Sequence, residues 1–234
     1  MSEPEAACYL VAGCKPWNRE VYERSIRDLP GRWHYAGSKE QLGAEAVDAL
    51  HPRYIFFLHW SWKVPQEIVD RHECIAFHMT DLPYGRGGSP LQNLIVRGHR
   101  ETRLSAFRMS HEIDAGPIYL KEDLCLEGTA REIYERATVL SARMVGRIVR
   151  DQPQPVPQEG EVVAFKRRTR EDSEIPADLR SPERIYDFIR MLDCEGYPPA
   201  FVERHGFRFE FRNARLDDGR LEAGVTVVPR EEKR

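Results

Sequence analysis

The chain alternates short runs of consecutive apolar residues with longer stretches in which apolar positions recur every three or four residues. Residues 8–13 (CYLVAG), 54–58 (YIFFL) and 73–78 (ECIAFH) are runs of the first kind, which predict strands covered on both faces. Helical spacing appears in residues 18–29 and 39–50. Strands and helices in this order predict an α/β, Rossmann-like fold with a mostly parallel sheet flanked by helices.

Two more strands and a long helix are expected in the middle of the chain. The segments RLSAFRM (103–109) and PIYLKED (117–123) read as strands on either side of the turn SHEIDAG. Thr129 and Glu132 have the spacing of a capping box, which predicts that the long helix begins there. Asn18 is expected to cap the first helix.

A change of composition predicts a smaller C-terminal unit. The proline-rich segment QPQPVPQEG is typical of an extended, stiff connector. Ser181 and Pro182 can start the helix PERIYDFIRMLD, and the alternation in FRFEF predicts an antiparallel sheet. We therefore expect a catalytic domain over residues 1–152, a linker over 153–180 and a small α+β unit over 181–234.

Composition narrows the classes of partner. The formal net charge is −3 over 234 residues, so no overall field would attract bulk nucleic acid or an anionic membrane. No stretch approaches the roughly 20 apolar residues of a membrane span, and the first residues lack a basic region before an apolar run. We expect a cytoplasmic protein. Five scattered cysteines, none spaced as CxxC, favour neither a disulfide framework nor a structural zinc site.

Three polar residues in predicted loops could carry chemistry. His78 ends a buried strand, where an imidazole can titrate near neutrality in a cleft, or can simply fasten the loop through a backbone hydrogen bond. Asp114 lies in a turn, where it could orient such a histidine or cap its own backbone. Arg86 lies among glycines, where it could bind phosphate or carboxylate or remain solvated.

Two other groups of residues have alternative interpretations. The run KRRTR (166–170) could bind phosphate, but acidic residues follow it directly, so a solvated, self-paired surface is favoured. Trp60 and Trp62 could stack on a flat heterocycle or pack at the edge of the sheet.

The combination WSWKVP, AFHMTDLPYGRGGSP and EIDAGP, in this order, resembles the 10-formyltetrahydrofolate-dependent formyltransferases, the family of methionyl-tRNA formyltransferase-like enzymes. The resemblance covers residues 54–150, with a weaker match beyond. The blocks FHMTDLP.GRGGSPLQN and YDFIRMLD..GYP.AF look similar to short sugar N-formyltransferases of the pseudaminic acid pathway type.

The resemblance implies roles for particular residues. It makes His78 the catalytic histidine and Asp114 its acidic partner. The implied walls of the folate pocket are Trp60, Ser61, Trp62, Lys63, Val64, Glu112, Ile113 and Asp114. The implied acceptor-binding residues are Thr80, Arg86, Gly87 and Gly88. No metal is implied.

One departure from the family pattern affects the chemistry. The family's asparagine, two residues before the histidine, is Ala76 here. Alanine cannot donate a hydrogen bond to the formyl oxygen, and loss of such a donor can cost about a hundredfold in rate. Gln92 and Asn93 are the nearest amides that could replace it, with Thr80 as a weaker alternative.

The resemblance also implies a reaction. The formyl group of 10-formyltetrahydrofolate would pass to a primary amine, and a nucleotide-linked amino sugar is the expected acceptor. The alternatives are an aminoacyl or peptidyl group on a carrier or tRNA, hydrolysis of the formyl folate, and a folate-binding module without catalysis. A homodimer is inferred only by analogy.

Overall fold

A computed structural model describes residues 6–230 of the chain. The residues group into two compact units, each assembled from three segments. Of the described residues, the first unit comprises 6–87, Thr102–Leu124 and Glu135–Ala164. The second unit comprises Gly88–Glu101, Cys125–Tyr134 and residues 165–230. The domain boundaries expected at residues 152 and 180 remain a prediction.

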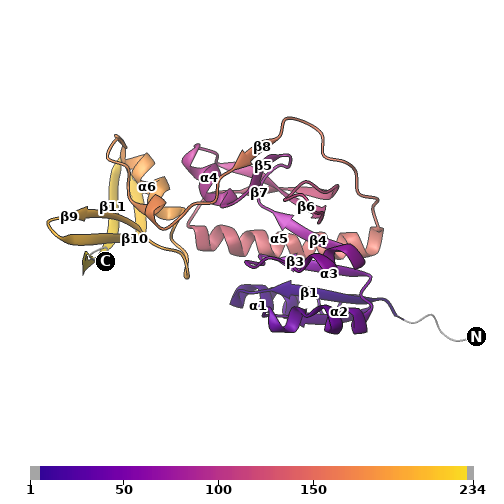
Figure 1. The fold of residues 1–234 in the computed structure, drawn as a ribbon. Coiled ribbons are helices and arrows are strands. Elements are labelled where there is room, and N and C mark those ends of the chain that lie inside the picture. Colours follow the sequence, from indigo (N-terminus) through magenta and orange to yellow (C-terminus); the bar gives the residue numbers. More distant parts are fainter. Residues whose placement is uncertain (1–5, 231–234) are drawn as a thin grey trace, which may run out of the picture. The chain divides into compact units, whose positions relative to one another are not determined.

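A six-stranded sheet in the order β2-β1-β3-β4-β6-β7 forms the first unit (Figure 1). Its strands are β1 (Cys8–Gly13), β2 (Arg32–Ala36), β3 (Tyr54–Leu58), β4 (Cys74–His78), β6 (Glu101–Arg108) and β7 (Ile118–Cys125). The pairs β1–β2, β1–β3 and β3–β4 are parallel, and β4–β6 is antiparallel. The expected α/β fold with a mostly parallel sheet is confirmed.

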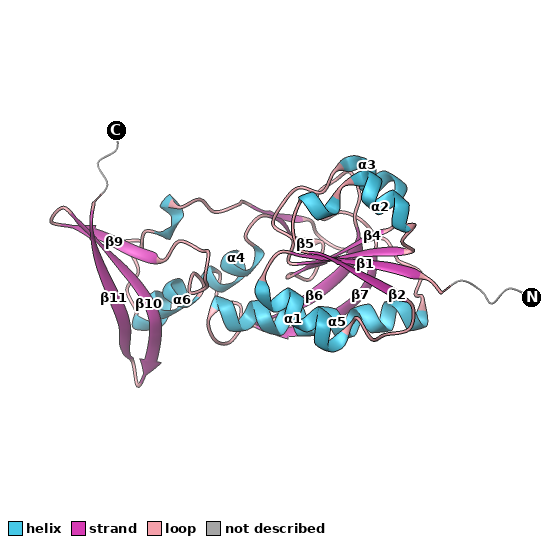
Figure 2. Ribbon diagram, turned by 90° about the horizontal axis from the view of Figure 1, so that it is seen from below, coloured by secondary structure: helices cyan, strands magenta, loops and turns pink. Residues whose placement is uncertain are grey.

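Helices cover both faces of this sheet, as Figure 2 shows. Helices α2 (Ala44–Leu50) and α3 (Gln66–Arg71) lie over one face, and α1 (Pro16–Ser25) and the long α5 (Ala130–Asp151) lie over the other. Every side chain of β3 is buried, because helices exclude water from both sides. Coverage of the sheet on both faces therefore explains why β3 is apolar at consecutive positions.

Local capping differs from expectation in two places. Asn18 does not cap α1; it is the third helical residue, and its Oδ1 accepts from the backbone nitrogen of Lys15, the N-cap, at 2.9 Å. The helix expected over 39–50 is divided at Gly43 into the short 3₁₀ helix η1 (Glu40–Leu42) and α2.

The capping box before α5 is confirmed. The backbone nitrogen of Thr129 donates to Glu132 Oε2 at 2.7 Å, and the Glu132 nitrogen donates to Thr129 Oγ1 at 3.3 Å. Two backbone donors of the first turn are thereby satisfied.

The second unit contains a three-stranded antiparallel sheet in the order β11-β10-β9, as the alternating sequence predicts. Its elements are α4 (Pro90–Val96), η2 (Glu171–Ser173), α6 (Pro182–Arg190), β9 (Ala200–Arg204), β10 (Phe207–Asp217) and β11 (Arg220–Pro229). Ser181 caps α6 by accepting from the Arg184 nitrogen at 3.4 Å, which confirms the expected start of the helix.

A buried arginine joins α6 to the loop before α5. Arg190 is 1% exposed, and its Nη1 donates to the backbone oxygens of Leu126 at 2.6 Å and Gly128 at 2.8 Å. Its Nε donates to Asp187 at 2.7 Å. The charge is therefore paired with a carboxylate, and only Nη2 is buried without a hydrogen-bond partner among residues 6–230.

Strand β5 (Tyr84–Gly87) is a feature that the sequence pattern did not predict. It pairs with β8 (Val163–Phe165) in a separate two-stranded sheet. The glycine-rich loop after His78 is thus partly held in a strand by residues beyond the proline-rich segment. Within residues 6–230, no helix is long and apolar enough to cross a membrane.

Candidate active site

His78 is the last residue of β4, at the carboxyl end of the parallel strands. The residue is 8% exposed. Its Nε2 lies 2.8 Å from the backbone oxygen of Gly85. Because a carbonyl oxygen only accepts, Nε2 is the donor in this contact. This bond fixes the ring and directs Nδ1 to the opposite side.

Asp114 lies on that side. Its Oδ2 is 3.6 Å from His78 Nδ1 and accepts from the backbone nitrogen of Gly87 at 2.9 Å. The residue has a left-handed backbone, with φ of 53°, a conformation that aspartate tolerates better than most residues. Asp114 and His78 therefore lie close together. The turn that carries Asp114 has to reach back to His78, because β6 ends with Arg108 opposite Ile75, near the start of β4.

The turn between β6 and β7 reaches back to His78 because it is tightly closed at its base. The backbone nitrogen of Arg108 donates to the oxygen of Pro117 at 2.9 Å. A Cβ atom at Gly116 would lie 1.7 Å from the backbone oxygen of Arg108. Only glycine fits at this position without a backbone shift.

Gln158, in the proline-rich connector, holds the same turn from the other side. Its Nε2 donates to the backbone oxygens of Asp114 and Gly116, both at 2.8 Å. Its Oε1 accepts from Nε of Arg86 at 3.1 Å and from Nη2 at 2.8 Å. Sequence reasoning missed this residue, because a glutamine after Pro157 in an extended connector carries no periodic signal.

Arg86 is consequently engaged within the turn network. Besides Gln158, its Nη1 contacts Glu112 Oε1 at 3.3 Å. The guanidinium holds the loop of β5 to the Asp114 turn, and its expected contact with an acceptor remains a prediction. Gly87 also helps to hold Asp114 beside His78, because its backbone nitrogen donates to the Asp114 carboxylate.

The loop that follows β3 has aromatic and buried members. The Trp60 and Trp62 rings meet edge to face with centroids 4.9 Å apart. Trp60 Nε1 is buried without a hydrogen-bond partner among residues 6–230. Val64 packs into the core cluster beside α2 and α3, and Ser61 Oγ lies 3.4 Å from Cys14 Sγ. Two rings and an unused donor fit one end of a pocket for a flat heterocycle.

The other expected wall is the turn itself. Ile113, next to Asp114, is 74% exposed, and the Glu112 side chain is 77% exposed. An exposed apolar side chain beside the pair is available to a ligand. The roles expected for these residues and for Lys63 in folate binding remain predictions.

His59 opens this loop in an unusual electrostatic state. It has a left-handed backbone with φ of 48°. Burial, and secondarily the Lys15 ammonium, lowers the pKa of His59 to about 4. The imidazole is neutral at physiological pH, so it contributes no charge to the site.

Ala76 lies two residues before His78 and packs against Leu82, Phe107 and Ile118. It offers no side-chain donor. Thr80 is fully buried, and its Oγ1 lies 3.5 Å from the oxygen of Gly85.

The two amides expected to replace the donor belong to the second unit. Gln92 Nε2 donates to Tyr134 Oη and to the Met191 oxygen, both at 3.0 Å. Asn93 Nδ2 donates to backbone oxygens that include Lys166 at 3.1 Å. Both nitrogens are therefore engaged, and a role at the formyl oxygen would require these bonds to break; that role remains a prediction. Gly88 also lies in this unit.

No group of three or more His, Cys, Asp or Glu side chains within residues 6–230 is arranged to hold a metal ion.

Comparisons with known proteins identify relatives of this chain in sequence and in fold. A family model described as methionyl-tRNA formyltransferase, C-terminal domain, matches residues 170–228. Methionyl-tRNA formyltransferase of Gluconobacter oxydans is 30% identical over 192 residues, covering 80% of this chain. The chain spans only 59% of the length of that relative.

Solved structures match over more of the chain. One described as methionyl-tRNA formyltransferase from Clostridium thermocellum is 42% identical, with a TM-score of 0.89 over 95% of this chain and 99% of that one. A sugar N-formyltransferase from a Shewanella species is 15% identical, with a TM-score of 0.61 over 97% of this chain and 99% of that one. The second likeness shows the shared fold alone.

Proposed function

The chain belongs to the formyltransferase family of methionyl-tRNA formyltransferase-like enzymes, and from this premise we propose that it transfers a formyl group from 10-formyltetrahydrofolate to a primary amine. The observation that carries the proposal is the pairing of His78 with Asp114 at the end of β4. The bound folate supplies the formyl carbon that the amine attacks.

His78 is the proposed proton donor. Its Nε2 is committed to the Gly85 oxygen, whereas the 3.6 Å between Nδ1 and Asp114 is longer than a direct hydrogen bond. Nδ1 is therefore the atom at which a proton can pass to the departing nitrogen. With a proton on both nitrogens, the ring also stabilises negative charge on the formyl oxygen.

Asp114 is the proposed proton acceptor. The attacking amine loses a proton as its bond to the formyl carbon forms, and the Asp114 carboxylate takes it directly or through water. The Gly87 nitrogen and Gln158 keep the carboxylate and its turn in place. A fixed carboxylate needs no reorganisation during the reaction, which is the main advantage of a prebuilt polar site.

Trp60, Trp62 and Ile113 are the proposed hydrophobic contacts of the folate. The buried, unpartnered Nε1 of Trp60 is a donor that an acceptor atom of the folate ring system would satisfy. A saturating folate should therefore quench or shift the tryptophan fluorescence, and Trp60→Phe, which removes only the donor and part of the ring, should weaken folate binding.

For the acceptor, we propose an aminoacyl group on tRNA ahead of a nucleotide-linked amino sugar. The family model over residues 170–228 and the relatives at 30% and 42% identity all carry the name of the tRNA enzyme. The amino sugar was expected from sequence blocks alone, and the sugar enzyme compared here is 15% identical. The proposed acceptor is carried by a nucleic acid, whereas the small net charge led us to expect no bulk nucleic acid as a partner.

One experiment separates the candidates. Purified protein is incubated with 10-formyltetrahydrofolate and, in separate reactions, methionyl-tRNA, a panel of nucleotide-linked amino sugars, or no acceptor. We expect a product heavier by one formyl group with methionyl-tRNA. Formylation of the amino sugars but not of methionyl-tRNA would make an amino sugar the favoured acceptor. Folate turnover without any acceptor would identify a hydrolase. Folate binding with no turnover in any reaction would refute the enzymatic proposal.

A further inference from the structure

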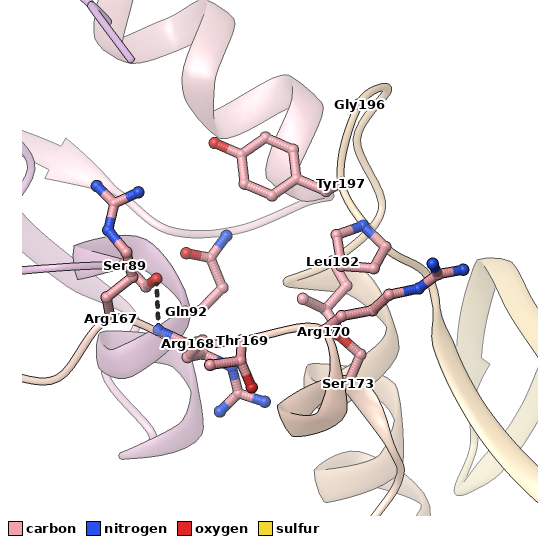
Figure 3. A pocket seen from close by; sticks show the side chains of 11 residues that line it. Ser89, Gln92, Arg167, Arg168, Thr169, Arg170, Ser173, Leu192, Gly196 and Tyr197 are labelled. Carbon is pink, nitrogen blue, oxygen red and sulfur yellow. Dashed lines mark hydrogen bonds between the residues drawn. The ribbon is translucent and has the colours of Figure 1, made fainter. Parts of the chain in front are cut away.

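A cavity of about 570 Å³ lies within the second unit, apart from the His78–Asp114 pair. Its volume is within the range of small-molecule sites, about 300–1,000 Å³. Figure 3 shows its lining. The lining residues are Ser89, Gln92, Arg167, Arg168, Thr169, Arg170, Ser173, Leu192, Gly196, Tyr197 and Pro198.

The basic wall of the cavity is fixed to the start of α4. The Arg168 nitrogen donates to Ser89 Oγ at 3.1 Å, and Asn93 Nδ2 donates to the Lys166 oxygen at 3.1 Å. A Cβ atom at Gly88 would lie 2.5 Å from the Cα of Arg167. Close backbone approach and side-chain hydrogen bonds therefore hold the segment KRRTR in one place.

The charges of this segment are only partly compensated. Asp172 accepts from the backbone nitrogen of Thr169 at 2.6 Å and from its hydroxyl at 3.2 Å. These bonds, and the nearby charges of Arg168 and Lys166, lower the pKa of the Asp172 carboxyl. Arg167 and Arg170 are exposed, and their guanidinium groups form no ion pair or hydrogen bond with any residue in 6–230. Figure 3 shows them leaving the segment in different directions, so a ligand held by both guanidinium groups requires their side chains to rotate toward it.

Gln92 adds a directed acceptor at the base of the cavity. The side chain is 3% exposed. Its Nε2 must face the Met191 carbonyl, to which it donates at 3.0 Å, and this fixes the orientation of the amide. Oε1 receives no hydrogen bond from a residue in the described chain. An amide oxygen that lines a cavity without a protein partner can accept from a ligand or from water.

The remaining wall is apolar and aromatic. Leu192 and Pro198 line it with Tyr197, whose ring stacks on Tyr134 with centroids 5.5 Å apart. The stack holds the Tyr197 ring rigid, and Figure 3 shows the ring and the amide of Gln92 directed toward the same space. A flat ligand with a hydrogen-bond donor suits this wall.

We propose that this cavity binds a free nucleoside phosphate, with the phosphate held by Arg167 and Arg170 and the base between Tyr197 and Leu192, donating to Gln92 Oε1. Guanidinium groups pair with phosphate oxygens through charged, directional hydrogen bonds. The site lies outside the reacting pair and does not depend on the proposed function.

Calorimetric titration of the full chain tests the proposal with four probes: AMP, adenosine, ribose 5-phosphate and inorganic phosphate. We expect AMP to bind at least tenfold more tightly than each of the other three, because only AMP carries both the phosphate and the base. Equal affinity for AMP and inorganic phosphate would overturn the assignment of the base, and no binding of AMP at about 1 mM would overturn the site.

Matched double variants locate the binding. R167A/R170A should weaken AMP binding at least tenfold, whereas R143A/R215A, which removes the same charge from exposed and unpaired arginines elsewhere, should change it less than twofold. Equal losses in both would show a general charge effect and refute the site. A short RNA could instead bind tenfold more tightly than AMP and lose this higher affinity in R167A/R170A. That result would overturn the proposal of a free nucleotide as ligand and identify the cavity as an RNA contact.

Discussion

Nδ1 of His78 lies 3.6 Å from the carboxylate of Asp114, and the backbone nitrogen of Gly87 donates to the same carboxylate oxygen at 2.9 Å. We expect Asp114→Asn to lower kcat by about 10²–10⁴, the usual contribution of a positioned acid or base, while the amide oxygen keeps the bond to Gly87. His78→Ala should lose a similar factor. Steady-state turnover measures both; a variant that is folded by circular dichroism and retains near-parental kcat would remove its residue from the mechanism.

Gln158 should act as a positioning residue. Gln158→Leu removes the two donors to the Asp114 turn and the acceptor of Arg86, so we expect kcat to fall about tenfold, since displaced groups react poorly. KM for the folate should stay within about twofold, because the aromatic contacts are untouched. The control is Gln154→Leu, an exposed glutamine of the same connector. A parallel rise in KM, or an equal effect of the control, would argue against positioning.

Ala76→Asn should increase turnover. The amide nitrogens of Gln92 and Asn93 are already engaged, so a new donor two residues before His78 should raise kcat by about tenfold to a hundredfold. Ala76→Leu, similar in volume and without a donor, is the control and should lower kcat. If Ala76→Asn gives no gain in a folded protein, another group already stabilises the oxygen.

Gly116→Ala should destabilise the fold. The added Cβ would lie 1.7 Å from a backbone oxygen, which cannot move away as a side chain could, so we expect a loss of about 3 kcal/mol in the free energy of unfolding. Gly146→Ala, where the nearest atom is at 3.8 Å in Leu29, should instead gain up to about 1 kcal/mol as a helical alanine. Urea denaturation compares them, and equal midpoints would contradict the turn geometry.

His59 should make stability sensitive to acid. Its pKa is about 4 in the folded chain and about 6.5 when unfolded, so the unfolded state binds more protons between these values. Stability therefore falls as pH drops through this window, by about 2 kcal/mol at pH 5 relative to pH 8. His59→Asn removes the titrating group, and asparagine tolerates the left-handed backbone. The fall in the free energy of unfolding from pH 8 to pH 5 should therefore be about 2 kcal/mol smaller in this variant. An unchanged difference would show that His59 titrates normally.

The sequence was sufficient for the parts of the fold that repeat a pattern. The runs that became β1 and β3 are buried on both faces, the run of β4 is partly buried, and Thr129 and Glu132 mark the start of α5 through local spacing. Asn18 was misassigned because Pro16 can begin a helix two residues earlier, which makes Asn18 an internal member of the first turn.

The site was predictable only in part, for a physical reason. His78 and Asp114 could be selected by residue type and loop position, with the family pattern to pair them. Gln158 acts through backbone oxygens of a turn far away in sequence, and such contacts place no requirement on neighbouring residues. The run KRRTR is largely exposed, as expected, and Asp172 interacts with Arg168 and Lys166. Residue type alone could not show that Asp172 also accepts from the backbone of its own turn.

The left-handed backbone of Asp114 has a consequence for how variants of this protein are compared. Glycine adopts a φ of 53° without steric cost, whereas aspartate accepts it with some strain. Glycine at position 114 would relieve that strain but would lose the carboxylate that accepts from the Gly87 nitrogen, so these two effects on stability oppose each other. Variants at this position should therefore be ranked by turnover, because stability alone does not report whether the carboxylate is present.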